Sequence, residues 1–314
     1  MKKLLLIFLV ILVHQSIKAQ LSEEAIFTQY TANHAIINPG AIGFNDGNQA
    51  FMNIRRSLQG FPGSPTSYAI SYNGAAGEVL GLGANIFSEN VSQLTRFRFQ
   101  AGVGVRFKIT DDLKLAGGLT GEISQRKLGS AILDNPFYQA GDQIIEGNVD
   151  GIRYFDVAFG LYGSFKENTY FGISSPNLVT TRLNALEAKK DSIIGLSFLV
   201  GHKFEFGEVV FEPSLMALKM ESVPLRVDLN LLAHFLDEQF TAGLIYRHID
   251  APFDSKAGGN AAILLGIKIT AFKLFYSYDV SFLEFQQFNG GGHEVTIAFD
   301  FKGDSSTRSR RRKF

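Results

Sequence analysis

The chain of 314 residues contains no cysteine, no tryptophan and only 8 prolines. Without cysteine there is no disulfide framework and no thiol chemistry. Lysine and arginine (30) balance aspartate and glutamate (30), and charged residues make up only 19% of the chain. A neutral, sparsely charged chain of this kind does not suit nucleic-acid binding, so we expect no nucleic-acid partner.

Long apolar runs are also scarce, and the longest one stands at the start of the chain. Residues 4–13 (LLLIFLVILV) follow Lys2 and Lys3 and precede the small residue Ala19. A basic start, a short apolar stretch and a small residue at the end are typical of a secretory signal peptide. The run is about half the roughly 20 residues that a membrane-spanning helix needs. We therefore predict a signal peptide at residues 1–19; a mature chain placed in a membrane must then form a closed barrel.

The chain does contain 32 glycines, 29 phenylalanines and long alternating segments. In residues 96–109 (RFRFQAGVGVRFKI), the odd positions are apolar and the even positions are charged, polar or glycine. Side chains alternate across a strand, so this pattern predicts a β-strand with one apolar face and one polar face. Its length suits a tilted strand that crosses a bilayer, which takes roughly 9–11 residues. Residues 113–124 repeat the pattern after a turn and complete a hairpin.

Fourteen segments have strand character, and those at 49–57 and 169–174 are the weakest. They are residues 49–57, 66–73, 79–87, 96–109, 113–124, 152–164, 169–174, 192–203, 208–218, 225–235, 239–248, 260–269, 271–280 and 293–301. The connections after every second strand are tight, whereas most of the others are longer. Outer-membrane barrels share this habit of short periplasmic turns and long extracellular loops.

These patterns predict an all-β fold, an antiparallel transmembrane β-barrel of about 14 strands with short periplasmic turns and longer extracellular loops. Its place is the cell outer membrane, and an even strand number returns both termini to the periplasm. The predicted organisation is a signal peptide (1–19), a periplasmic N-terminal segment (20–48), the barrel (49–301) and a basic C-terminal tail (302–314).

The segments outside the strands offer candidate interaction surfaces. Ser22 can begin a short helix that runs to about Tyr30, because serine caps helix N-termini. Loops 125–151 and 175–191 are either binding surfaces or solvated connections, and residues 182–190 suit one or two helical turns. The tail is either a solvated charge run or a contact for acidic protein or lipid head groups.

The motifs of common enzymes are missing. We find no nucleophile elbow, zinc-protease helix or phosphate-binding loop. The histidines of the mature chain stand singly on different elements, without metal-ligand spacing: His34, His202, His234, His248 and His293. We predict no enzyme and no cofactor, although a triad gathered by folding stays possible. The charges on the polar strand faces are of both signs. We favour mutual pairing across the interior over an ion-selective pore.

Several short motifs resemble one known family. An F-x-Q-Y element at residues 27–30 precedes the hexapeptide NPGAIG at 38–43. Arg55 and Arg56 are followed by Gly60 and Pro65, YSYD stands at 276–279, and GHEV stands at 292–295. In this order, and over nearly the whole mature chain, they resemble the PorP/SprF-type membrane proteins of the type IX secretion system. The basic tail departs from that pattern.

The resemblance implies an outer-membrane barrel that helps to export or anchor surface proteins and adhesins, in some members for gliding motility. It implies two protein partners: a secreted surface protein with a C-terminal sorting domain, and a peptidoglycan-associated periplasmic lipoprotein of the secretion machinery. Outer-membrane lipid is the third partner. The main alternative is a passive porin or hydrophobic-solute channel. The candidate partner-binding residues are Phe27, Gln29, Tyr30, Asn38 and Pro39, which can equally well plug or brace the mouth of the barrel.

Overall fold

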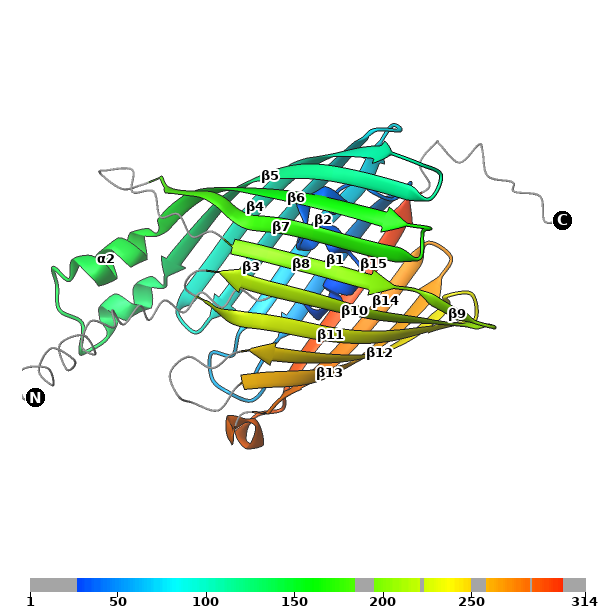
Figure 1. The fold of residues 1–314 in the computed structure, drawn as a ribbon. Coiled ribbons are helices and arrows are strands. Elements are labelled where there is room, and N and C mark those ends of the chain that lie inside the picture. The colour runs from blue at the N-terminus through cyan, green and yellow to red at the C-terminus, as the bar shows by residue number, and fades with distance from the viewer. Residues whose placement is uncertain (1–26, 184–194, 221–222, 250–257, 283, 302–314) are drawn as a thin grey trace, which may run out of the picture.

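The computed structural model describes residues 27–183, 195–220, 223–249, 258–282 and 284–301. These residues form one antiparallel sheet that closes on itself as a barrel (Figure 1). The strands are β1 (Asn48–Arg56), β2 (Thr66–Ala76), β3 (Leu80–Val91), β4 (Leu94–Lys108), β5 (Leu113–Leu128), β6 (Ile152–Phe165), β7 (Thr169–Arg182), β8 (Gly195–His202), β9 (Phe204–Phe206), β10 (Val209–Met220), β11 (Val223–Phe235), β12 (Phe240–Ile249), β13 (Gly258–Ile269), β14 (Phe272–Ser281) and β15 (Gly292–Phe301).

The barrel has fourteen strand positions, as the sequence predicts. The short β9 continues β8 after a break at Lys203, because both pieces pair with β10. Each strand pairs with its neighbours in the chain, and the β15–β1 and β10–β11 pairings complete the ring. Each of the fourteen strand positions thus pairs on both sides, as a sheet in lipid requires, although β7 beyond Ser174 pairs only with β6 among the described residues.

The largest difference from the predicted strands is in β7, which continues to Arg182 instead of ending near residue 174. A bulge makes this possible: Phe159 pairs with Ser175 and Val157 with Val179, so three residues of β7 oppose one of β6. Pro176 lies in the bulge, where its missing N–H costs no ladder hydrogen bond. The bulge breaks the alternating pattern of the sequence, so the second half of the strand could not be predicted from that pattern.

The two ends of the barrel differ. At the end that we call the turn end, six short connections join the strands: residues 77–79, 109–112, 166–168, 207–208, 236–239 and 270–271. The opposite end, the loop end, carries the excursion 129–151, which contains η4 (Ser130–Asp134) and α2 (Gln143–Asp150), and the connection 282–291, which contains η5 (Glu284–Phe288). α2 projects from this end in Figure 1.

Two of the expected long connections are short. β3 and β4 are joined by residues 92–93 alone, because Val91 already pairs with Leu94. β10 ends at Met220 and β11 begins at Val223. Most of the 182–190 stretch expected to form helical turns lies outside the described residues. The helix expected to end near Tyr30 begins outside them, and its described part is the 3₁₀ turn η1 (Thr28–Thr31).

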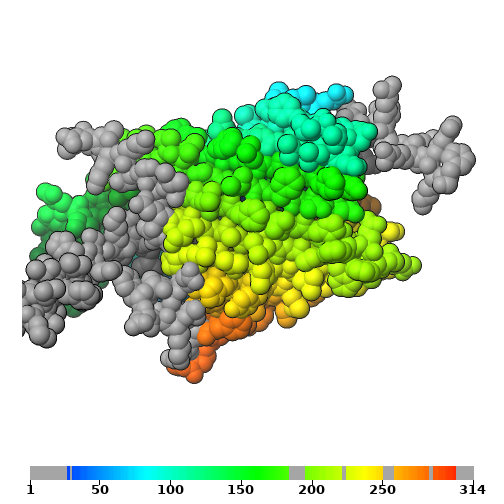
Figure 2. Space-filling view, viewed as in Figure 1, coloured from blue at the N-terminus to red at the C-terminus, as the bar shows by residue number. Residues whose placement is uncertain are grey.

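The outer wall is apolar, as the alternation predicts. In β4, Phe97, Phe99, Val103 and Phe107 are exposed, and the even positions face inward. The space-filling view shows the wall from β6 to β12 as a continuous surface (Figure 2). Exposed phenylalanine, leucine and isoleucine side chains over a closed sheet are what contact with hydrocarbon requires. Among the described residues, no helix is long and apolar enough to cross a membrane.

This arrangement predicts the effect of one charge placed in the outer wall. Leu244 on β12 is 61% exposed and pairs with Leu231, well inside the band. Leu244→Arg should lower the free energy of unfolding by about 2–4 kcal/mol, because an arginine near the bilayer centre is poorly solvated. The measurement is reversible urea unfolding in lipid vesicles.

The matched control is Leu236→Arg, in a turn where the side chain is 55% exposed. The cost there should be near zero, since the arginine reaches the interface. Equal costs at the two positions would show that the wall does not face lipid.

Candidate functional site: the plugged lumen

Residues 27–47, which we call the plug, lie inside the barrel and not in front of it. They form three single-turn 3₁₀ helices, η1, η2 (His34–Ile36) and η3 (Pro39–Ala41). Asn33 and Asn38 cap the second and third through their side-chain oxygens. We expected residues 20–48 to form a periplasmic segment. The described part of that segment instead fills the lumen and joins β1 at the turn end.

A row of inward-facing glycines gives the plug its seat. A Cβ atom at Gly118 would collide with the carbonyl oxygen of Pro39, and one at Gly81 or Gly104 with that of Ile42. The plug backbone therefore packs directly on the strand backbones, at distances that only glycine allows. The seat comprises Gly81, Gly83, Gly102, Gly104, Gly118, Gly160 and Gly172, on strands β3 to β7.

Asn38 fixes the centre of the plug to the wall. Its side-chain Oδ1 accepts the N–H of Gly40 at 2.8 Å, and its Nδ2 donates to the Leu161 carbonyl at 3.0 Å. The amide occupies space that the absent side chains of Gly160 and Gly172 leave open. Asn38 is buried, so each of these bonds replaces one to water, and loss of the amide would leave buried backbone groups unpaired.

At its loop-end side the plug is held by a cluster of buried charges, the Arg55 cluster: Thr28, Arg55, Asp279 and Glu294. Arg55 forms ion pairs with Glu294 at 2.9 Å and with Asp279 at 3.0 Å. The N–H of Thr28 donates to Glu294, and the Thr28 hydroxyl accepts from Arg55. Three motifs that are far apart in the sequence, at 55–56, 276–279 and 292–295, thus meet in one hydrogen-bonded group.

The sequence-predicted partner residues all belong to the plug. Tyr30 is fully buried, and its hydroxyl accepts a hydrogen bond from Asn230 at 2.8 Å. Phe27 is buried edge-on against Phe87. Asn38 and Pro39 are buried in the seat; Gln29 belongs to η1, and its side chain lies outside the described set. The placement is that of residues bracing the plug, and contact with a partner stays a prediction.

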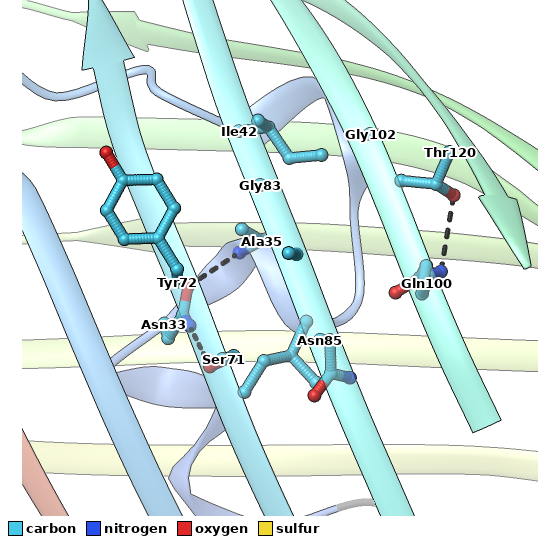
Figure 3. Close-up of a pocket in the computed structure, with 12 residues that line it drawn as sticks. Asn33, Ala35, Ile42, Ser71, Tyr72, Gly83, Asn85, Gln100, Gly102 and Thr120 are labelled. Carbon is cyan, nitrogen blue, oxygen red and sulfur yellow. Dashed lines mark hydrogen bonds between the residues drawn. The ribbon is translucent and has the colours of Figure 1, made fainter. Parts of the chain in front are cut away.

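A small crevice remains between the plug and strands β2 to β5 (Figure 3). Ile42 lies over Gly83 and Gly102 there, and Asn33 donates to the Ser71 hydroxyl at 3.4 Å. Its volume is about 20 Å³, enough for about one water molecule. The plug therefore packs closely against this side of the lumen wall.

Charges at the loop-end level of the lumen pair with one another, but within one strand or between nearby strands and not across the interior as we expected. Asp228 accepts from both Arg226 and Arg247, at 2.7 and 3.0 Å. On the other side of the lumen Arg96 pairs with Glu89 at 2.9 Å, and Arg98 with Glu122 at 3.6 Å. Together with the Arg55 cluster these pairs encircle the plug. Paired charges of both signs give no net field that would select an ion.

At the turn end the plug leaves a chamber of about 530 Å³. One wall is polar: Tyr170 and His234 both donate to the buried carboxylate of Glu212, at 2.7 and 3.2 Å, and Lys203 lies 3.8 Å from it. The other wall holds Leu264 and Phe275. The plug, through His34, Ala41 and Phe44, closes the chamber on the inner side.

His34 ties the plug to the polar wall. Its Nδ1 lies 2.7 Å from the Tyr162 hydroxyl, and its ring packs on Tyr170 with 4.7 Å between centroids. Burial lowers the pKa of His34 to about 4, despite the opposing effect of Glu212. The imidazole is therefore neutral at ordinary pH and serves as a packing and hydrogen-bonding group. Among the described residues, no group of three or more acidic or histidine side chains is placed to hold a metal ion.

The glycine seat predicts a test by side-chain addition. Gly118→Val places a branched side chain where the Pro39 carbonyl lies, so the plug should leave its seat and the lumen should conduct in planar bilayers. Gly121→Val on the same strand is the control, because the nearest atom to a Cβ there is on Phe155 at 3.8 Å. Conductance that is equal in the two variants would contradict the seat.

His34 predicts a pH dependence. The folded-state pKa lies below the ordinary 6.5, so protonation opposes docking of the plug. The stability of the docked plug should be constant above pH 6.5 and should fall as pH falls towards 4. Conductance in planar bilayers between pH 7 and 4 measures this, and His34→Phe should remove the dependence. A plug that loosens above pH 7 would contradict it.

Two comparisons bear on identity. Residues 19–299 match the family described as "Type IX secretion system membrane protein PorP/SprF". A search of the curated proteins finds no match.

Among solved structures, the chain is similar to "CymD monoaromatic hydrocarbon channel", with a TM-score of 0.50, 13% identity, and coverage of 88% of this chain and 91% of that one. It is also similar to "TodX deltaS2S3 mutant monoaromatic hydrocarbon channel", with a TM-score of 0.52, 11% identity, and coverage of 86% and 94%. At these identities the likeness shows the barrel fold alone. The family match covers nearly the entire chain, and the chain belongs to the PorP/SprF family of type IX secretion system membrane proteins.

Proposed function

We propose that this barrel helps to export or anchor surface proteins through type IX secretion, without catalysis. The observation that carries the proposal is the plug: residues 27–47 fill the lumen and the charges around them pair. A barrel whose lumen is filled by its own chain is better suited to serve as a rigid base for other proteins than to serve as an open pore. Its cargo would be a secreted protein with a C-terminal sorting domain, in keeping with the family.

The loop-end excursion supports contact with an exported protein. Phe137 is 93% exposed and Ile144 is 78% exposed, on a segment held in shape by its own bonds. Asp142 caps α2, and Glu146 accepts from the Tyr138 hydroxyl at 2.7 Å, which lowers the pKa of Glu146. Two large exposed apolar side chains on an ordered loop suit a contact with another protein.

Under this proposal the turn end and the plug face the rest of the secretion machinery. The turn end would meet the peptidoglycan-associated lipoprotein, and the C-terminal end of β15, which lies at the turn end, would face the periplasm. The N-terminal side of the plug, at Thr28, lies towards the loop end. Phe27, Gln29, Tyr30, Asn38 and Pro39 would contact a partner when the plug leaves the lumen, since they are held in or beside the seat while it is docked. Gliding motility would follow if the anchored cargo is an adhesin.

A second candidate is a passive channel for small apolar solutes. It is favoured by the turn-end chamber, in which Phe275 and Leu264 form an apolar wall. Steady conductance of the purified wild-type barrel in planar bilayers would favour this candidate. The export proposal expects the wild type to stay closed at neutral pH and to conduct when residues 20–47 are removed or the plug leaves its seat.

The export proposal is tested at the cell surface. Deletion of the gene should remove at least one large surface protein, detected by mass spectrometry of proteins released by external protease. The double variant Phe137→Ser, Ile144→Ser should lower the amount of that protein several-fold, while the barrel itself stays at normal level.

Gln139→Ser with Gln143→Ser is the matched control, because both are exposed polar residues of the same excursion. A normal surface protein profile after gene deletion would overturn the proposal. An equal loss of the surface protein in both double variants would show that the two apolar side chains have no specific role.

A further inference from the structure

The turn-end chamber has an arrangement of charges that the secretion role does not explain. Lys268 on β13 and Lys273 on β14 are directly opposed in the strand register, and both line the chamber. Like charges opposite one another on neighbouring strands destabilise a sheet unless something compensates them.

The compensation within the wall is incomplete. Lys273 pairs with Asp300 at 3.0 Å, and Asp300 is also held by Gln49 at 2.7 Å. Lys268 has no ion pair within 4.0 Å among the described residues. Glu238 is close enough to interact with the charge of Lys268, but its carboxylate contacts Lys203, at 3.4 Å. Of the two opposed lysines, Lys268 is therefore the one that contacts no carboxylate among the described residues.

An apolar surface begins next to the two lysines. Phe275 lies two residues from Lys273 on the same inward face, is half-buried, and packs over Gly266. Behind it, Leu264 and Leu232 meet over Gly243 and complete a small apolar cluster. A ligand entering from the turn end thus meets a positive charge first and an apolar wall behind it.

We propose that this chamber binds a small amphipathic carboxylate, with the carboxylate between Lys268 and Lys273 and the apolar body against Phe275. The volume of about 530 Å³ is in the range of small-molecule sites, roughly 300–1,000 Å³. The plug closes the inner side, so the ligand is held and not passed on. The proposal does not depend on the secretion role.

The test is calorimetric titration of the full barrel in phosphatidylcholine nanodiscs, with empty nanodiscs as the blank. The probes are 4-phenylbutyrate, 4-phenylbutan-1-ol and 4-phenylbutylamine, which share a body and differ in head group. We expect binding of the carboxylate, at least about tenfold weaker binding of the alcohol, and none of the amine.

The variants locate the site. Lys268→Met should weaken phenylbutyrate binding about tenfold, and Lys268→Arg should keep it within about threefold. Lys108→Met is the matched control: it removes one positive charge at the same end, from a side chain that is 60% exposed, paired with Asp111 and outside the chamber. Phe275→Leu should weaken the binding of phenylbutyrate less than Lys268→Met does. Circular dichroism and heat-modified gel mobility confirm folding of each variant.

Three results would overturn the proposal. They are no heat beyond the blank, equal binding of the carboxylate and the alcohol, and equal effects of Lys268→Met and Lys108→Met. Each leaves the surface-protein experiment untouched, so a failure of this site is distinguishable from a failure of the export role.

Discussion

The whole structure depends on how closely the plug backbone approaches the strand backbones. An irregular segment inside a barrel must find partners for its own N–H and C=O groups, because few waters reach it. Here the glycine seat removes the side chains that would separate plug and wall, and Asn38, Asn73 and Ser174 supply the hydrogen bonds. The outer face of the same strands needs only apolar bulk. One sequence can meet both demands because the two faces alternate residue by residue.

The lumen is consequently divided along its length. At the loop end, the Arg55 cluster holds Thr28 of the plug through buried charges, which are costly to break one partner at a time. In the middle, packing on glycine holds it. At the turn end, the chamber interrupts the packing, and His34, Glu212 and the lysines line it. The plug is thus held by three different kinds of contact along its length.

The sequence predicts the barrel well because the alternation of apolar and polar residues within each strand reflects its lipid-facing and inward-facing sides. The alternation in residues 96–109 and 225–235 requires no knowledge of the rest of the chain. The prediction fails where the alternating pattern is interrupted, as at Pro176 in β7. The sequence offered a plug at the barrel mouth as one of two interpretations, but the seat inside the lumen was out of reach for a different reason. No local pattern connects residues 38–43 with the glycines at 81, 102 and 118. Only the fold shows that they face each other, although such glycines on successive strands are a signal that can be sought. The Arg55 cluster joins residues 239 positions apart, which no local pattern reports.

The absence of cysteine makes the central claim, that the plug occupies the lumen, directly measurable. Asn33 and Ser71 contact each other in the structure, one from the plug and one from β2 (Figure 3). With Asn33→Cys and Ser71→Cys introduced together, a short bifunctional thiol reagent should cross-link the two positions in isolated outer membranes. The pair Asn33→Cys with Ser130→Cys, on the loop-end excursion, should not. Efficient cross-linking of the first pair alone is the predicted result. Free reaction of Asn33→Cys with a bulky polar thiol reagent, without a cross-link to Ser71→Cys, would contradict it.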